Sequence, residues 1–99
     1  MAYIKNNSFK NISFEDFRKI IKSINKAKSV NGKTYEFKVE NDKIIGIRHS
    51  TMEPFKISLN NLYEAYTNLN EFSTTVLKDF VDRVQSPSLA ILKEANLII

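Results

Sequence analysis

The sequence predicts an α+β fold in which an N-terminal helix, a three-stranded antiparallel meander and three short C-terminal helices pack on one sheet face. The spacing of apolar residues changes from a helical period to a period of two near residue 34, and becomes helical again near residue 58. Each predicted element has one apolar face, and such faces are buried when a sheet packs on a helical layer. We expect residues 1–99 to form one domain, with residues 1–12 as an N-terminal arm.

The first predicted element is a helix from about Phe14 to Lys28. Ser13 is a suitable N-cap, because its side chain can accept a hydrogen bond from the free N–H groups of the first turn. Asn31-Gly32 follows the helix, and glycine is common just after a helix end. One apolar stripe with helical spacing runs along the segment, formed by Phe14, Phe17, Ile20, Ile21 and Ile24.

The first predicted strand covers residues 34–40, and Asn41-Asp42 forms the turn after it. Alternation of apolar and polar residues is typical of a half-buried strand. The apolar positions that we expect to face the helices are Tyr35, Phe37 and Val39.

The second predicted strand covers residues 43–49, and residues 55–57 form a short third strand. We place Ile45 and Ile47 on the inward face. Because side chains alternate along a strand, this register points Ile44 outward, on an edge of the sheet.

Three helices are predicted after the sheet. They cover residues 59–69, residues 73–84 and a segment that starts at Ser86-Pro87, where proline suits the first helical turn. The chain ends with the apolar tail Leu97-Ile98-Ile99. Apolar tails seldom stay in water, so we expect this one to dock in the core, to add a short strand, or to contact a partner.

Composition excludes several classes of function. The chain has no cysteine, which excludes disulfides, thiolate metal sites and thiol catalysis. No apolar run approaches the roughly 18 residues that a membrane span needs, and the N-terminus lacks the apolar core of a signal peptide. We therefore expect a cytoplasmic protein with no membrane partner, metal or cofactor. The abundance of Asn, Lys and Ile is typical of an A+T-rich bacterial or phage genome.

Positive charge is concentrated in the first third of the chain. Residues 1–33 carry eight Lys and Arg against two acids, residues 34–57 are neutral, and residues 58–99 have three Lys and Arg against five acids. On a helix from 14 to 28, Arg18, Lys22 and Lys26 would lie at i, i+4 and i+8 on one face. A row of cations on one face can contact the phosphates of a nucleic-acid backbone.

These observations lead to the first hypothesis for function, a small non-catalytic protein whose basic N-terminal helix face contacts the backbone of DNA or RNA, in a regulatory role. Such contacts would read little sequence, because phosphates carry none directly. The residues that we expect to bind are Arg18, Lys19, Lys22 and Lys26, supported by Lys10, Lys28 and Lys33.

The alternative hypothesis is a protein-interaction module. This class includes small inhibitors, immunity-type proteins and regulatory proteins that dock on the acidic surface of a larger protein or form a homodimer. The apolar residues that we expect at such an interface are Ile44, Leu97, Ile98 and Ile99.

Catalysis has little support in the sequence. His49 is the only histidine, and no motif of catalytic or metal-ligating residues accompanies it. A hydrogen-bonded surface histidine is the simpler interpretation, and we expect the protein not to be an enzyme. Helices 59–69 and 73–84 could resemble a helix-turn-helix, but Asp79 and Asp82 would repel phosphates, which favours an ordinary hairpin in the core.

Overall fold

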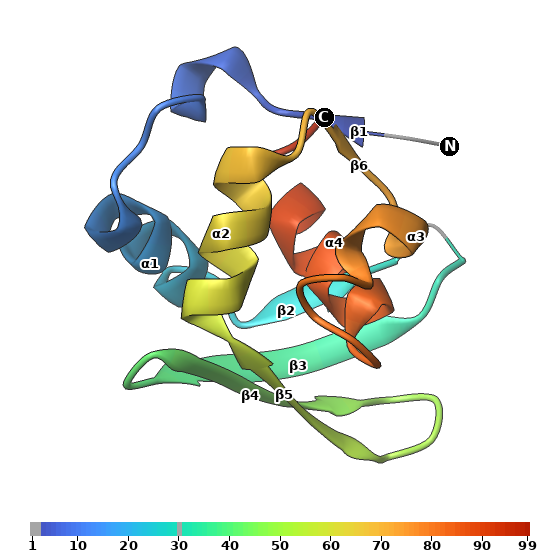
Figure 1. Cartoon of the computed structure of the whole chain (residues 1–99). Helices are drawn as coiled ribbons and strands as arrows, with labels where there is room; N and C mark the ends of the chain where they lie inside the picture. The colour runs from blue at the N-terminus through green and yellow to red at the C-terminus, as the bar shows by residue number, and fades with distance from the viewer. Residues whose placement is uncertain (1–2, 30) are drawn as a thin grey trace.

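The computed structural model describes residues 3–29 and 31–99 and contains a four-stranded antiparallel sheet with helices on one face (Figure 1). The strand order is β2-β3-β4-β5, and these strands span Lys26–Lys28, Thr34–Glu40, Lys43–Arg48 and Pro54–Ser58. The helices on that face are α1 (Phe14–Lys22), α2 (Leu59–Asn68) and α4 (Gln85–Glu94). The remaining elements are β1 (Tyr3–Ile4), the 3-10 helix η1 (Asn7–Phe9), β6 (Glu71–Phe72) and the one-turn α3 (Thr74–Leu77). The α+β class is confirmed.

The strand predicted at residues 34–40 is confirmed as β3. Tyr35 and Phe37 are buried against the helices, whereas Glu36 and Lys38 are exposed on the other face. Asn41 turns the chain with φ of 57°, in the left-handed region that asparagine tolerates. Alternation within one short segment was therefore sufficient to identify the buried face of this strand.

The helix predicted from Phe14 to Lys28 is wrong beyond Lys22. Ser13 caps α1 as expected, since its side chain accepts a hydrogen bond from the N–H of Asp16 at 3.2 Å. After Lys22 the chain instead forms β2, which pairs with β3 and makes the sheet four-stranded rather than three-stranded. The physical reason lies in burial: β2 places Ala27 in the core, and the free edge of β3 supplies backbone partners that a longer helix would leave unpaired.

The predicted register of the second strand is also wrong. Ile44 is fully buried and faces the helices, whereas Ile47 is 41% exposed on the open face of the sheet. Gly46 shares the inward face with Ile44. A side chain there would collide with the ring of Phe55, the Cβ of Phe37 and the carbonyl oxygen of Glu36, so the glycine makes room for the neighbouring strands. Because glycine has no side chain, an inward glycine interrupts the alternation of apolar and polar residues from which the register was predicted.

The helix predicted at residues 73–84 is a single turn. Ser73 caps α3, accepting a hydrogen bond from the N–H of Val76 at 3.4 Å. The helix ends at Leu77, and the following turns bury Val81 and place Arg83 at φ of 70°. A left-handed residue cannot continue a right-handed helix, so the chain changes direction before α4 starts at Gln85.

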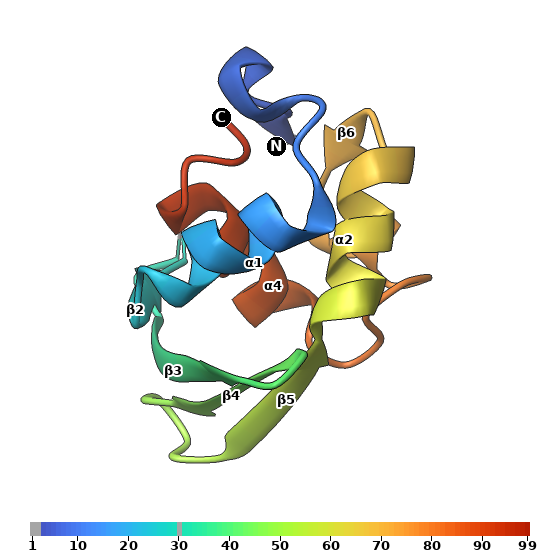
Figure 2. The same ribbon diagram turned by 90° about the vertical axis from the view of Figure 1, so that its left-hand side faces the viewer.

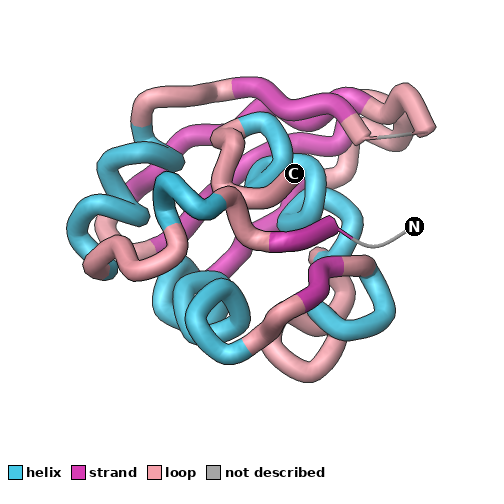
Figure 3. Tube along the Cα trace, turned by 90° about the horizontal axis from the view of Figure 1, so that it is seen from above, coloured by secondary structure: helices cyan, strands magenta, loops and turns pink. Residues whose placement is uncertain are grey.

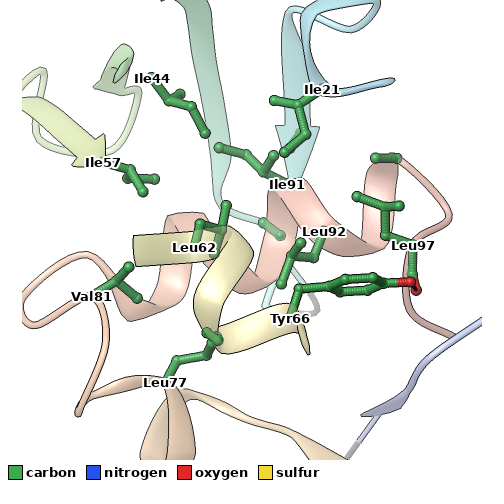
Figure 4. Close-up of a cluster of buried hydrophobic side chains, with 14 of the residues drawn as sticks. Ile21, Ile44, Ile57, Leu62, Tyr66, Leu77, Val81, Ile91, Leu92 and Leu97 are labelled. Carbon is green, nitrogen blue, oxygen red and sulfur yellow. Dashed lines mark hydrogen bonds between the residues drawn. The ribbon is translucent and has the colours of Figure 1, made fainter. Parts of the chain in front are cut away.

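Helix α4 lies at the centre of the fold. Figure 4 shows Ile91 and Leu92 surrounded by side chains from α1, α2, the sheet and the C-terminal tail. Both residues are fully buried, and Pro87, Ser88 and Ala90 are buried too. Figure 2 shows the helix between α1 and α2, above the sheet. A helix that is buried on nearly all sides serves as the core around which other elements assemble.

The two ends of the chain pair with one another. The N–H of Ile4 donates to the carbonyl of Ile99 at 2.9 Å, and the N–H of Ile99 donates to the carbonyl of Ile4 at 2.8 Å. On its other side β1 pairs with β6, and Figure 3 shows these segments together near the C-terminus. The hydroxyl of Tyr66 holds both ends to α2 through the carbonyls of Phe9 and Leu97. The expectations that the tail docks in the core and adds a strand-like pairing are confirmed.

We predict that Gly46→Ala destabilises the protein by about 1–3 kcal/mol, the usual cost of overpacking a core. The added Cβ would lie 2.6 Å from the ring of Phe55, 2.8 Å from Cβ of Phe37, and closer still to the carbonyl oxygen of Glu36. Denaturant unfolding followed by circular dichroism measures the change. Lys38→Thr on the open face is the control and should stay within about 0.5 kcal/mol. Equal stability of Gly46→Ala and the wild type would contradict the packing described.

A second prediction concerns Ser88, whose hydroxyl is fully buried and has no hydrogen-bond partner in the described part of the chain. Ser88→Ala removes an unpaired polar group, so we expect the free energy of unfolding to rise by about 1 kcal/mol. The matched control is Ser13→Ala, which deletes a helix cap and should lower stability by about 1 kcal/mol. A loss of stability in Ser88→Ala comparable to the control would mean that this hydroxyl is hydrogen-bonded.

Candidate functional site

The basic residues predicted on the first helix are partly neutralised. The guanidinium of Arg18 donates to the carbonyl of Asn41 at 3.2 Å and lies 3.7 Å from the carboxylate of Asp42. Lys19 lies 3.9 Å from Glu15, one turn earlier on α1. Arg18 therefore fixes the β3–β4 turn to the helix, which is a structural role.

The remaining predicted cations lie on several elements, because α1 ends at Lys22. Lys26 is on β2, where its ammonium lies 3.5 Å from Glu36. Lys10 follows η1. The row at i, i+4 and i+8 therefore does not exist. Lys28 and Lys33 lie elsewhere, at the end of the sheet where β2 leads into β3, and both line a pocket there.

This pocket, which we call the lysine hollow, has a volume of about 80 Å³. It lies between the β2–β3 turn, β1, α3 and one side of α4. Three lysines line it, and the described lining contains no carboxylate. The full lining is Tyr3, Lys28, Ser29, Asn31, Lys33, Tyr35, Thr74, Ser86, Leu89, Ala90 and Lys93.

A second pocket adjoins the first and is called here the arginine hollow. Its volume is about 320 Å³, and it shares Lys33, Tyr35 and Ser86 with the lysine hollow. Arg48 and Arg83 line it, together with polar residues of the β4–β5 loop and the first turn of α4. We call the two hollows together the basic cleft. Its lining comes from α4 and from the β2–β3 and β4–β5 connections, and both connections are at the right-hand end of the sheet in Figure 1.

The β2–β3 turn presents Lys33 through its own hydrogen bonds. The N–H of Ser29 donates to the carbonyl of Lys33 at 2.8 Å, and the N–H of Lys33 donates to the hydroxyl of Ser29 at 3.1 Å. Gly32 has φ of 83°, a conformation that glycine adopts at little cost. Lys28 and Lys33 are therefore held at opposite ends of one tight turn, and both line the lysine hollow.

Arg48 is the most firmly placed cation of the cleft. Its guanidinium donates to the carbonyls of Pro54 at 3.3 Å and Arg83 at 3.1 Å, and lies 5.5 Å from the ring centroid of Phe55. Two carbonyls use only two of the five N–H donors, so the group keeps donors for a ligand. The bond to Arg83 also stabilises the left-handed residue that turns the chain toward α4.

One side of α4 forms the wall between the hollows and the core. Ser86, Leu89, Ala90 and Lys93 are spaced at i, i+3, i+4 and i+7, and all four line the lysine hollow. The ammonium of Lys93 lies 5.3 Å from the ring centroid of Tyr3, which lines the same pocket. This cation–π contact holds a third lysine at the hollow.

The cleft concentrates positive charge that the protein itself does not balance. None of its five cations has a nitrogen within 4.0 Å of a carboxylate oxygen in the described residues, and Glu53 is the one acid in the described lining. The cations are Lys28, Lys33, Arg48, Arg83 and Lys93. Burial raises the pKa of the Tyr35 hydroxyl, while Arg48 lowers it to a smaller extent, so the phenol stays protonated and can donate. A concave surface lined by one sign of charge attracts anions.

The apolar residues proposed for a protein interface are mostly in the core. Ile44 and Leu97 are 0% exposed and Ile98 is 1% exposed, so their side chains do not reach a partner. Only Ile99, at 61%, is exposed. The open face of the sheet instead shows Ile47, next to Pro54 in the register of β4 and β5.

The described residues offer no candidate metal site and no candidate membrane-spanning helix. In residues 3–29 and 31–99, no three His, Asp or Glu side chains are placed to hold a metal ion. The same residues contain no helix long and apolar enough to cross a membrane. His49 is in the turn after β4, with its Nε2 3.4 Å from a carboxylate oxygen of Glu36, as expected for a hydrogen-bonded surface histidine.

Comparison with protein-family models, with curated proteins and with solved structures gave no significant match. Sequence reasoning identified Lys28 and Lys33 but missed Arg48, Arg83 and Lys93. The sequence does contain a signal for Lys93. Ser86, Leu89, Ala90 and Lys93 are spaced at i, i+3, i+4 and i+7, so they share one helix face that is polar at its ends and apolar in the middle.

A third prediction follows from the pair formed by His49 and Glu36. The pKa of the Glu36 carboxyl is below its ordinary value of 4.5, chiefly because His49 hydrogen-bonds to it, and to a smaller extent because of Lys26. His49→Ala should raise this pKa, and Lys26→Ala should raise it less. Titration of the carboxyl carbon by NMR gives both values. A larger rise in Lys26→Ala than in His49→Ala would contradict this order of causes.

Proposed function

We propose that this chain is a non-catalytic nucleic-acid-binding protein that holds the phosphate backbone of a strand in the basic cleft. The observation that carries the proposal is the convergence of five cations, from β2, the β2–β3 turn, β4, the turn before α4, and α4 itself, on two adjoining hollows. The proposal keeps the polyanion expected from the sequence and moves its site from the α1 face to the cleft.

The balance of charge in the cleft supports an anionic ligand. Cations that lack a protein counter-ion repel one another, and an anion in the cleft relieves that repulsion. The first turn of α4 adds to the attraction, because its N-cap Val84 makes no side-chain hydrogen bond and helix N-termini carry partial positive charge. Gln85 and Ser86 of that turn line the arginine hollow.

The hydrogen-bond donors of the cleft suit phosphate oxygens. Hydroxyls and amides of this kind make many of the phosphate contacts in protein–DNA complexes, and arginine binds phosphate with two parallel N–H groups. The neutral donors in the two linings are Ser29, Asn31, Tyr35, Ser50, Thr51, Thr74, Gln85 and Ser86. Glu53 is the one carboxylate in the described lining, which contains no histidine, so the cleft is better suited to binding an anion than to general acid–base catalysis.

The fourth prediction is a salt-dependent affinity for nucleic acid. Labelled single- and double-stranded DNA and RNA are titrated with the protein at about 50 and 200 mM salt. Five phosphate contacts on a single strand should weaken binding by about 100-fold between these concentrations, since each contact contributes about 0.7 to the logarithmic slope. The variant Lys33→Glu/Arg83→Glu/Lys93→Glu should lose at least about tenfold in affinity at the lower salt and show a shallower slope.

Two triple variants with the same change in net charge are the controls. Lys38→Glu/Lys43→Glu/Lys56→Glu reverses exposed charges of the sheet and should bind nearly as well as the wild type. Lys19→Glu/Lys22→Glu/Lys26→Glu reverses three of the residues first predicted from the sequence to bind nucleic acid. Circular dichroism establishes that each variant is folded.

The outcomes separate the two placements. Loss of binding in the cleft variant alone supports the cleft. Loss in the Lys19/Lys22/Lys26 variant alone returns the site to the residues first predicted from the sequence and overturns the cleft assignment. Equal losses in all three variants would show that net charge, not a site, controls affinity. No binding at the lower salt would overturn the proposed function.

A further inference from the structure

The lysine hollow is smaller than the arginine hollow. Its volume is about 80 Å³, whereas the volume of the arginine hollow is about 320 Å³. A space of that size holds a group of a few heavy atoms, comparable to a few water molecules, and is too small for a whole nucleotide. A strand whose backbone lies in the arginine hollow could insert one terminal group into the lysine hollow.

The charge of the lysine hollow indicates which terminal group fits. Three lysines line it, and its described lining contains no acid. An internal phosphodiester carries one negative charge, whereas a terminal phosphate monoester carries about −1.5 to −2 at neutral pH and has three strong acceptor oxygens. A dianion therefore balances Lys28, Lys33 and Lys93 better than a diester does.

The rest of the lining strengthens this preference. Leu89 and Ala90 form an apolar floor, and the ring of Tyr35 is buried beside it. Apolar groups beside a charge lower the local dielectric constant, which strengthens the attraction between opposite charges. Tyr3 holds the ammonium of Lys93 at 5.3 Å from its ring centroid, so this cation is already at the hollow before a ligand arrives.

We infer that the lysine hollow binds the terminal phosphate of the strand whose backbone lies in the arginine hollow. The inference rests on the proposed function, because it names the end of the nucleic-acid ligand that the cleft recognises. Donors for the three terminal oxygens are available on Ser29, Asn31, Thr74 and Ser86, which line the same hollow.

The test compares one single-stranded oligonucleotide made with a 5′-phosphate, with a 3′-phosphate, or with hydroxyls at both ends. We expect one of the two phosphorylated forms to bind at least about tenfold more tightly than the hydroxyl form at neutral pH. The preference should shrink at about pH 5.5, because the second pKa of a phosphate monoester is about 6 and the terminal group then loses one charge. Fluorescence anisotropy at constant salt measures all three affinities.

Two single variants localise the preference. Lys93→Gln and Lys28→Gln should each reduce the ratio between phosphorylated and hydroxyl forms toward one. Lys78→Gln, which removes an exposed lysine outside the described lining of the cleft, should leave the ratio unchanged. Both lysine-hollow residues are exposed, so these variants are expected to fold, and thermal unfolding checks this.

The outcomes distinguish this inference from the proposal on which it rests. Equal affinity for all three oligonucleotides would overturn the terminal-phosphate site and leave backbone binding in the cleft intact. A preference that persists in Lys93→Gln and Lys28→Gln would place terminal recognition outside the lysine hollow and also overturn the inference. Failure of every oligonucleotide to bind would overturn both.

Discussion

The burial of α4 is the constraint on which the rest of the structure depends. Ile91 and Leu92 are fully buried (Figure 4), and α4 packs directly on β2 and α3. Because α4 covers β2, the segment that could have extended α1 becomes a strand with Ala27 as its one buried side chain. The same packing leaves one side of α4 facing the end of the sheet, and that side forms the wall of the basic cleft.

The features that could be predicted from the sequence are those decided by neighbouring residues. Ser13 and Ser58 cap helices through hydrogen bonds within three residues, and the alternation in β3 reports its buried face directly. Strand β2 is different, because its sequence Lys-Ala-Lys is equally compatible with a helix. The strand is favoured only by pairing with the edge of β3, which folding brings beside it. The register of β4 was predicted wrongly for a similar reason. Gly46 makes room for Phe37 and Phe55, which lie on adjacent strands and are not its neighbours in the sequence.

Only two of the five cations of the candidate site could be predicted from the sequence, for the same physical reason. Counting charge along the sequence found Lys28 and Lys33 in the basic third of the chain. Arg48 lies in a neutral segment and Arg83 in an acidic one, so nearby acids in the sequence concealed them. Apart from Glu53, those acids are absent from the described lining, so the cleft gathers five cations around a single acid. Charge density along a chain therefore measures sequence neighbours, whereas a ligand meets spatial neighbours.

The pairing of the two chain ends has a consequence for the order of folding. Strands β2 to β5 are connected by short turns, so their ladder closes small loops at little entropic cost, whereas Lys5 and Ile98 must meet from opposite ends of the chain. We therefore expect the sheet to form early and the pairing of the ends to form late. Tyr3, on β1, is a wall of the lysine hollow, so the smaller half of the cleft is completed only in that last step, and brief opening of the ends would expose it to solvent.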